Sequence, residues 1–306
     1  MDKWVECIPN ISEGRDSAVL AAIRAAIETT PDVYLLDDSA DSDHHRSVFT
    51  FAGSPEAVTI AVLNLAKVVV QSIDLSRHRG VHPRMGALDV VPLVPLEGVT
   101  TDECVDEARR LGERLWNECR IPVYFYGAAA RRDDRRGLEN VRRGQFEGLR
   151  AALPEDETRR PDIGGPLLHE TVGATAVGVR PFLIAFNVNL ATPDLKIARE
   201  VARRVRESSG GLPAVKALGL ALEAREIAQV SMNLVDFERT PPRAAFEAVQ
   251  REAAALGVDV VESELIGLVP RNALGPTDAR DLMIRSFDDA MILENRLEAV
   301  RRRQEM

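Results

Sequence analysis

The stretch Ser47–Leu96 decides the fold, because it predicts a strand, a helix, an irregular hinge and a second strand in one run. SVFTFA (47–52) and ALDVVPLVPL (87–96) are short apolar or β-branched runs, which are typical of strands. SPEAVTIAVLNLAKVVVQSI (54–73) opens with a capping serine, a first-turn proline and an acid, and therefore predicts a helix. Between helix and second strand lies RHRGVHPRMG (77–86), where a glycine and a proline interrupt any regular backbone.

The residues before this stretch complete a β-α-β-β-α-β order. Trp4–Pro9 and Val33–Asp37 are predicted strands, and Asp16 is a predicted cap for the helix between them. This order is typical of a ferredoxin-like unit, in which two helices cover one face of an antiparallel sheet. A helix starting at the capping box of Thr100 and Glu103, then a strand at 121–126, are predicted to follow.

A second β-α-β-β-α-β series is predicted after a loop rich in glycine and proline at 161–173, which marks a boundary between lobes. We expect an α/β (α+β) protein with lobes at residues 1–179 and 180–306. The sheet faces left bare are expected to face each other across a ligand cleft. The elements of the second lobe are strands at 181–190, 215–222, 227–235 and 258–268, helices from Thr192 and at 243–256, and a helical tail from 281 to about 304.

Composition excludes several classes of function. The 306 residues carry 39 basic and 48 acidic side chains, a net charge of -9, which argues against nucleic-acid or membrane partners. The N-terminus has no signal-peptide pattern and no apolar run could span a bilayer, so a cytoplasmic protein is expected. Cys7, Cys104 and Cys119 lack metal-ligand spacing and are expected to be buried thiols.

All five histidines fall in predicted loops, which is the strongest functional signal. A general acid/base role suits His82, because Gly80 and Pro83 fix its loop and Arg84 could bind anionic groups. A metal site in the segment 41–45 (Asp41, Asp43, His44 and His45) is an alternative, but its spacing matches no known metal motif. No glycine motif typical of a nucleotide site occurs.

Weaker signals come from polar residues at strand ends and within a strand. Arg46 opens one predicted strand and Arg180 precedes another, so either could point into the cleft. Asn187 and Asn189 share a face of one strand, because side chains alternate with period two. The nine arginines among residues 131–160 are mixed with seven acids, which is typical of a solvated, partly helical connection.

Four motifs resemble the glutamate formiminotransferase family: VECIPNISEG (5–14), RH (77–78), HPRMGALDV (82–90) and FLIAFNVNL (182–190). The resemblance runs from the N-terminus to about residue 270. It implies two lobes around a folate-binding cleft, usually in a homodimer. The implied activity is transfer of a formimino group between 5-formiminotetrahydrofolate and glutamate in histidine degradation, with tetrahydrofolate as carrier and no metal.

The resemblance also implies roles for single residues. The catalytic histidine of the family falls on His82, and its paired asparagines fall on Asn187 and Asn189. Asp38 is a possible partner that orients His82, although Asp37, Asp41 and Asp43 remain open. Arg46, Arg84 and Arg180 are expected to hold substrate carboxylates. The folate-binding stretch falls on Ile163, Gly164, Gly165, Pro166, Leu167, Leu168, His169, Glu170, Thr171 and Val172.

The chain departs from the animal enzymes of this family near the catalytic histidine. Ser39 stands where those enzymes have an acid, His45–Arg46 replaces an Asn-Arg pair, and Val81 replaces a glutamate. These differences leave two alternatives open beside the formimino transferase. One is a folate-dependent formyltransferase on the same scaffold, and the other is a folate-binding protein without turnover.

Overall fold

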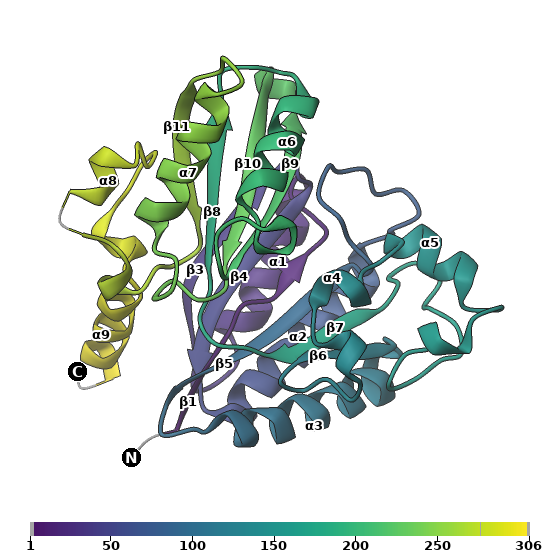
Figure 1. The fold of residues 1–306 in the computed structure, drawn as a ribbon. Coiled ribbons are helices and arrows are strands. Elements are labelled where there is room, and N and C mark those ends of the chain that lie inside the picture. The colour runs from purple at the N-terminus through teal and green to yellow at the C-terminus, as the bar shows by residue number, and fades with distance from the viewer. Residues whose placement is uncertain (1–2, 276, 305–306) are drawn as a thin grey trace. The chain divides into compact units, whose positions relative to one another are not determined.

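The computed structural model describes residues 3–275 and 277–304. It divides into two compact units, residues 1–180 and 181–306, each with its own sheet and its own helices (Figure 1). Within the described residues, no helix is both long enough and apolar enough to cross a bilayer.

The first unit contains the predicted ferredoxin-like sheet. Its four main strands lie in the order β3, β4, β1, β5, and every neighbouring pair is antiparallel, which confirms the predicted unit. The two-residue strand β2 continues the line of β1 between β4 and β5. The elements are β1 (Trp4–Cys7), β2 (Asn10–Ile11), α1 (Ser17–Glu28), β3 (Val33–Asp41), β4 (Arg46–Gly53), α2 (Pro55–Ser72) and β5 (Leu88–Glu97).

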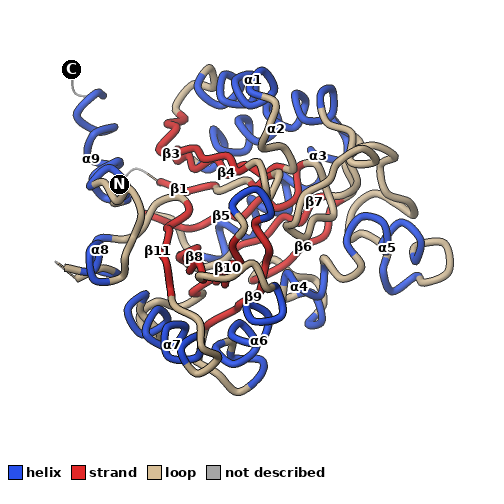
Figure 2. The backbone as a smooth tube through the Cα atoms, turned by 90° about the horizontal axis from the view of Figure 1, so that it is seen from above, coloured by secondary structure: helices blue, strands red, loops and turns tan. Residues whose placement is uncertain are grey.

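The helices of this unit begin where their capping residues predict. The side chains of Asp16 and Ser54 accept hydrogen bonds from the first backbone N–H groups of α1 and α2, and Thr100 and Glu103 form the capping box of α3 (Thr101–Cys119). These three helices pack side by side on one face of the sheet (Figure 2). The main core lies between them and the sheet, and it includes Phe49 and Phe51.

Two parallel strands extend this sheet beyond β5. β7 (Thr175–Val179) lies between β5 and β6 (Val123–Gly127) and is parallel to both. β7 was not predicted, because five residues after a glycine-rich loop give too short a pattern. It places the loop at 161–173 inside the first unit, not at its boundary. The connection from β6 to β7 contains η1 (Asp133–Arg135), α4 (Leu138–Val141), α5 (Gln145–Ala152) and η2 (Glu157–Arg159).

This connection covers part of the sheet face opposite α1, α2 and α3. Val141, Leu149 and Leu153 pack there against Tyr124 and Tyr126 of β6 in a second, smaller core. The connection is partly helical and largely exposed, as predicted, but its buried apolar side chains also make it a structural element of the sheet.

The second unit repeats the ferredoxin-like order without such an extension. Its strands lie in the order β11, β8, β10, β9, all antiparallel, and α6 and α7 cover one face (Figure 1). The elements are β8 (Ile184–Leu190), α6 (Leu195–Val205), η3 (Glu207–Ser209), β9 (Val215–Leu222), η4 (Glu223–Arg225), β10 (Ile227–Leu234), α7 (Pro242–Ala254) and β11 (Val260–Ile266).

The tail is only partly the helix that the sequence predicted. It contains η5 (Arg271–Ala273), α8 (Asp278–Asp281), η6 (Asp289–Met291) and α9 (Leu293–Gln304). Between α8 and α9 the chain forms no α-helix, only the short η6, because Ile284 pairs with Ser263 of β11 and Ile292 pairs with Val269. Backbone pairing along the sheet edge thus replaces helical hydrogen bonds there.

Candidate active site

A buried carboxylate at a β-bulge organises the polar residues of the first unit. Asn10 of β2 pairs with Val90 of β5, and Ile11 pairs with Leu88, so Asp89 has no partner residue across the ladder. Its side chain is 0% exposed, and one oxygen accepts hydrogen bonds from the backbone N–H groups of Met85 and Gly86 at 2.8 and 3.3 Å. Asp89 therefore fixes the end of the hinge.

The other carboxylate oxygen of Asp89 binds two arginines. Arg46 Nη1 lies 2.8 Å from it and Arg142 Nη2 lies 2.9 Å from it. Arg46 also donates from Nε to Asn10 Oδ1 at 3.1 Å. Burial acts to raise the pKa of Asp89, but the charges of Arg142 and Arg46 lower it below its ordinary value. Two cations against one buried anion leave this site net positive.

Both arginines keep a capacity for further contacts. Burial lowers the pKa of Arg46 to about 10, so it still carries its charge at neutral pH. Nε of Arg142 is buried and has no hydrogen-bond partner among the described residues. A positive site with an unsatisfied donor is suited to an anion such as a carboxylate.

His82 lies in the hinge, within the electrostatic reach of these two arginines. Its Nδ1 is 2.8 Å from the carbonyl oxygen of Pro83, which can only accept a hydrogen bond, so Nδ1 carries the proton. Burial lowers the pKa of His82 well below its ordinary value, and Arg46 and Arg142 act in the same direction. His82 is therefore neutral at pH 7, with the lone pair of Nε2 able to accept a proton.

An aspartate–histidine pair lies beside His82. The rings of His44 and His82 have centroids 6.2 Å apart. Nδ1 of His44 lies 2.9 Å from Asp41, and the backbone N–H of His44 donates to the same carboxylate. Although burial acts to raise the pKa of Asp41, these hydrogen bonds lower it to about 2. Asp41 is thus the acid that the structure links to the neighbourhood of His82.

The other two histidines of this region form a stacked pair that supports the hinge. The rings of His45 and His78 are nearly parallel, with centroids 4.2 Å apart. His78 Nε2 donates to the carbonyl of His45 at 2.9 Å, and its Nδ1 accepts from Arg84 Nε at 3.2 Å. Both ring nitrogens are thus engaged in hydrogen bonds. Burial lowers the pKa of His78 to about 4, so the ring is neutral at pH 7. These contacts indicate a structural role.

The hinge is held tightly against the turn between β3 and β4. A Cβ atom at Gly80 would lie 2.4 Å from the carbonyl oxygen of His44, so a side chain does not fit there. His45 Nδ1 lies 2.9 Å from the carbonyl of Arg79, and its Nε2 lies 3.2 Å from Glu13. The imidazole of His45 therefore connects the hinge, through Arg79, to Glu13.

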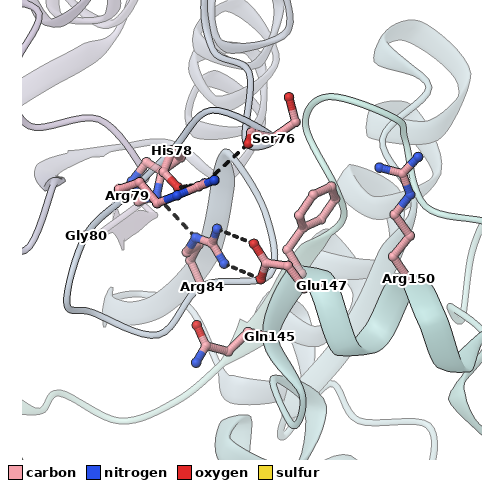
Figure 3. A pocket seen from close by; sticks show the side chains of 9 residues that line it. Ser76, His78, Arg79, Gly80, Arg84, Gln145, Glu147 and Arg150 are labelled. Atoms are coloured by element: carbon pink, nitrogen blue, oxygen red, sulfur yellow. Dashed lines mark hydrogen bonds and ion pairs between the residues drawn. The ribbon is translucent and has the colours of Figure 1, made fainter.

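A cavity of about 670 Å³ opens beside this hinge (Figure 3). Arg84 spans its wall, with two hydrogen bonds of 2.7 Å to the carboxylate of Glu147. Three arginines and one glutamate make the lining cationic. The lining residues are Ser76, His78, Arg79, Gly80, Arg84, Gln145, Phe146, Glu147 and Arg150.

The stretch Ile163–Val172 is tied to the hinge on both sides of His82. The backbone N–H of Leu75 donates to Thr171 at 2.7 Å, and that of Ala87 donates to Val172 at 2.9 Å. Nδ1 of His169 accepts from the backbone N–H groups of Thr171 and Val172, at 3.3 Å each. The predicted ligand loop and the predicted catalytic hinge are therefore one connected substructure.

Comparison with known proteins identifies the family. Residues 4–180 match the model of the formiminotransferase domain, N-terminal subdomain, and residues 185–300 match that of the formiminotransferase domain. The chain belongs to the formiminotransferase family. As a member of this family it is placed among the transferases.

Its curated relatives in the formiminotransferase family include stand-alone and fused proteins. The chain is 45% identical over 298 residues to glutamate formimidoyltransferase of Streptococcus pyogenes serotype M1, covering 97% of this chain and 99% of that protein. Identity to the Thermoplasma acidophilum glutamate formimidoyltransferase is 43%, over 96% of this chain and 97% of that protein. The Gallus gallus formimidoyltransferase-cyclodeaminase is 44% identical over 96% of this chain, which spans 54% of that longer protein.

Two other residues predicted for the site, Asp38 and Arg180, have interactions with residues other than His82. Asp38 pairs with Arg24, and the structure shows no hydrogen bond from Asp38 to His82 within the residues it describes. Arg180 ends the first unit, where its charge acts on Glu6 and Tyr126. Among residues 3–275 and 277–304, no group of three His, Cys, Asp or Glu side chains is placed to hold a metal ion.

Asn187 and Asn189 belong to a buried polar network of the second unit. Asn187 donates to Glu264 at 3.1 Å and Asn189 donates to Glu262 at 3.0 Å. Gln229 joins them, with Nε2 at 2.9 Å from both Asn189 and Glu264. These side chains lie on the face opposite Phe186 and Val188, which pack under the helices.

Arg142 is the site residue that sequence reasoning missed. It follows α4, in the arginine-rich connection that was expected to be solvated. Its distinguishing feature is the ion pair with Asp89, where its Nε is buried, and no local pattern carries that information. Arg135 of the same connection is a buried residue, 2.8 Å from Asp162.

Proposed function

We propose that the protein transfers a formimino group between 5-formiminotetrahydrofolate and L-glutamate, with His82 as the general acid/base. The observation that carries the proposal is a neutral, oriented imidazole next to a positive arginine site. The near full-length identity to glutamate formimidoyltransferases supports the choice of reaction.

The proposed steps balance without an added reactant. In one direction, the amine of glutamate attacks the formimino carbon as Nε2 of His82 takes its proton. The tetrahedral intermediate collapses as the bond from carbon to N5 of tetrahydrofolate breaks, and His82 returns the proton to N5. In the other direction the same steps run in reverse. Such proton transfer contributes about 10²- to 10⁴-fold to a rate.

The cationic residues are proposed to hold carboxylates. Arg46 and Arg142 form a positive pair within reach of His82, which suits the carboxylate of glutamate. Arg84 and the cavity beside it suit the anionic end of the folate, and the loop at 163–172 is bonded to Leu75 and Ala87 on either side of the hinge. Arg180, Asn187 and Asn189 remain proposed contacts. Of the candidate acids, Asp41 is proposed to act on His82 through His44, in preference to Asp38, which pairs with Arg24.

The direct test is an assay of purified protein with 5-formiminotetrahydrofolate and glutamate, following the folate product. We expect His82→Ala to lower kcat by about 10²- to 10⁴-fold. Val81→Ala is the matched control, because Val81 is the exposed neighbour in the same hinge. Nearly full activity in a folded His82→Ala protein would refute the assignment.

The alternatives separate in the same assay. A folate-dependent formyltransferase would use 5-formyltetrahydrofolate in place of the formimino donor, and a pure folate-binding protein would bind tetrahydrofolate without releasing a glutamate product. On the resemblance alone, we also propose a cytoplasmic homodimer that serves histidine degradation. Light scattering of the purified protein tests the dimer.

A further inference from the structure

Glu6 is a buried carboxyl group without a hydrogen-bond partner among the described residues. It lies in the middle of β1, where Ala52 of β4 and Val94 of β5 flank it. Its side chain is 0% exposed, and neither Oε1 nor Oε2 has a hydrogen-bond partner among the residues described. Few buried polar groups in proteins lack a hydrogen-bond partner.

The strand directs Glu6 away from the hydrophobic core. Its neighbours Val5 and Cys7 pack under α1, α2 and α3, so Glu6 points to the opposite face of the sheet. Side chains alternate between the two faces along β4, and Phe49 and Phe51 lie in the core under the helices. Arg46 therefore lies on the opposite face, as Glu6 does. Glu6 and the Arg46 site therefore share one surface of the sheet.

The surroundings of Glu6 do not neutralise it by a direct ion pair. Burial raises its pKa to about 7, and the charge of Arg180 opposes that rise. Burying an unpaired carboxyl group costs stability, and an apolar residue would avoid that cost. Hydrogen-bond donors of a bound ligand would supply the partners that this carboxyl group lacks.

We propose that Glu6 binds the N–H edge of the pteridine ring of the folate, accepting one hydrogen bond from ring N3–H and one from the 2-amino group. Two free oxygens of one carboxylate match two parallel donors in a planar ring. This inference rests on the proposed function, because that function supplies a pteridine ligand. It makes Glu6 a specificity-determining residue.

The position of Glu6 suits this role. Asn10 follows four residues later, in β2, which continues the line of β1 between β4 and β5. Asn10 contacts Arg46, whose charge reaches His82. On this proposal, a pteridine held at one end by Glu6 lies on the same face of the sheet as the Arg46 site.

The test is calorimetric binding of 5-formyltetrahydrofolate and of its 2-desamino-2-methyl analogue, which lacks one of the two donors. We expect wild-type protein to bind the analogue about 10- to 100-fold more weakly, as for a lost hydrogen bond to a charged group. In Glu6→Gln the difference should fall to within about threefold. Glu107→Gln is the matched control, because Glu107 is also buried but is bound by Thr59 and Arg110.

A second measurement uses only the wild-type protein, in case the variants do not fold. Binding at pH 7, compared in two buffers of different ionisation enthalpy, should release protons as the pteridine binds the ionised carboxylate. Equal affinity of the wild type for both compounds, or binding without proton release, would overturn the inference. So would full discrimination retained in folded Glu6→Gln.

The outcome is separable from that of the proposed function. Wild-type protein that transfers formimino groups but does not discriminate between the two compounds refutes the role of Glu6 alone. Wild-type protein that discriminates but shows no transfer refutes the proposed reaction and leaves the pteridine contact standing.

Discussion

The two units have the same arrangement of strands, and both carry a β-bulge at the second residue of the last strand in sequence of the β-α-β-β-α-β series, which is β5 in the first unit and β11 in the second. In β5 the bulged residue is Asp89, which is buried and holds two arginines. In β11 it is Val261, which is 45% exposed. The ferredoxin-like topology provides this irregular position in both units, but only the first unit surrounds it with an added connection that supplies Arg142. The ferredoxin-like fold thus provides the position of the bulge, and the added connection of the first unit provides a charged residue beside it.

The largest effect should come from changing the two bulges. Asp89→Asn removes the charge that Arg46 and Arg142 share, and we expect it to cost about 3–5 kcal/mol of unfolding free energy, as for a broken buried ion pair. Val261→Asn should change it by less than about 0.5 kcal/mol, as at an exposed site. Urea unfolding measures both. Equal costs would show that the bulge itself, not its carboxylate, matters.

A second difference between the units lies in the acids of their polar faces. Glu264 of the second unit accepts hydrogen bonds from amides, whereas Glu6 of the first has no partner among the described residues. The pKa of Glu6 is about 7 when folded against an ordinary value of 4.5, so folding binds a proton between these values. The contribution of Glu6 to the free energy of unfolding is therefore fully present below pH 4.5. The free energy of unfolding should fall by about 3 kcal/mol as the pH rises through 7.

Glu6→Gln should remove this fall, which urea unfolding at pH 5 and pH 8 would measure. Glu264→Gln is the control in the second unit and should leave the pH dependence of the wild type in place. An unchanged pH dependence in Glu6→Gln would mean that another group causes it.

A moderate effect should follow from cutting the link between the added connection and the sheet. Arg142→Met removes one of two cations near His82, and we expect kcat/KM to fall about tenfold, the effect of losing one charged hydrogen bond. Since Arg142 lowers the pKa of His82, its loss should raise that pKa and move the acidic limb of the rate profile to higher pH. Arg136→Met, on an exposed arginine of the same connection, should do neither.

The smallest effect distinguishes two candidate acids on β3. Asp41 hydrogen-bonds to His44 beside His82, whereas Asp38 pairs with Arg24. We expect Asp41→Asn to lower kcat several-fold and Asp38→Asn to change it less than about twofold, as for a partly exposed ion pair. The opposite ranking in steady-state kinetics would restore Asp38 as the partner of His82.

Much of the fold was predictable because its signals are local. Capping residues such as Asp16, Ser54 and Thr100 mark helix starts within four residues of chain, and apolar runs mark strands. β7 escaped prediction because its stability comes from pairing with β5 and β6 on both sides. The tail escaped because Ile284 pairs with a strand outside its own segment.

The site was predictable only where motif and chemistry coincide. His82 was selected by its hinge and by the family motif, but its protonated nitrogen depends on the carbonyl of Pro83, which only the structure shows. Arg142 depends on contact with Asp89, far along the chain, and no local pattern encodes that contact. Sequence thus predicted a catalytic side chain but not the charges that tune it.

The fit of Gly80 against the carbonyl of His44 has a consequence for how catalysis begins. A hinge that leaves no room for one methyl group is ordered before any substrate arrives. The conformational entropy of positioning His82 is therefore lost during folding and not during the encounter with substrate. Binding energy from the substrates remains available for bringing the amine and the one-carbon group together.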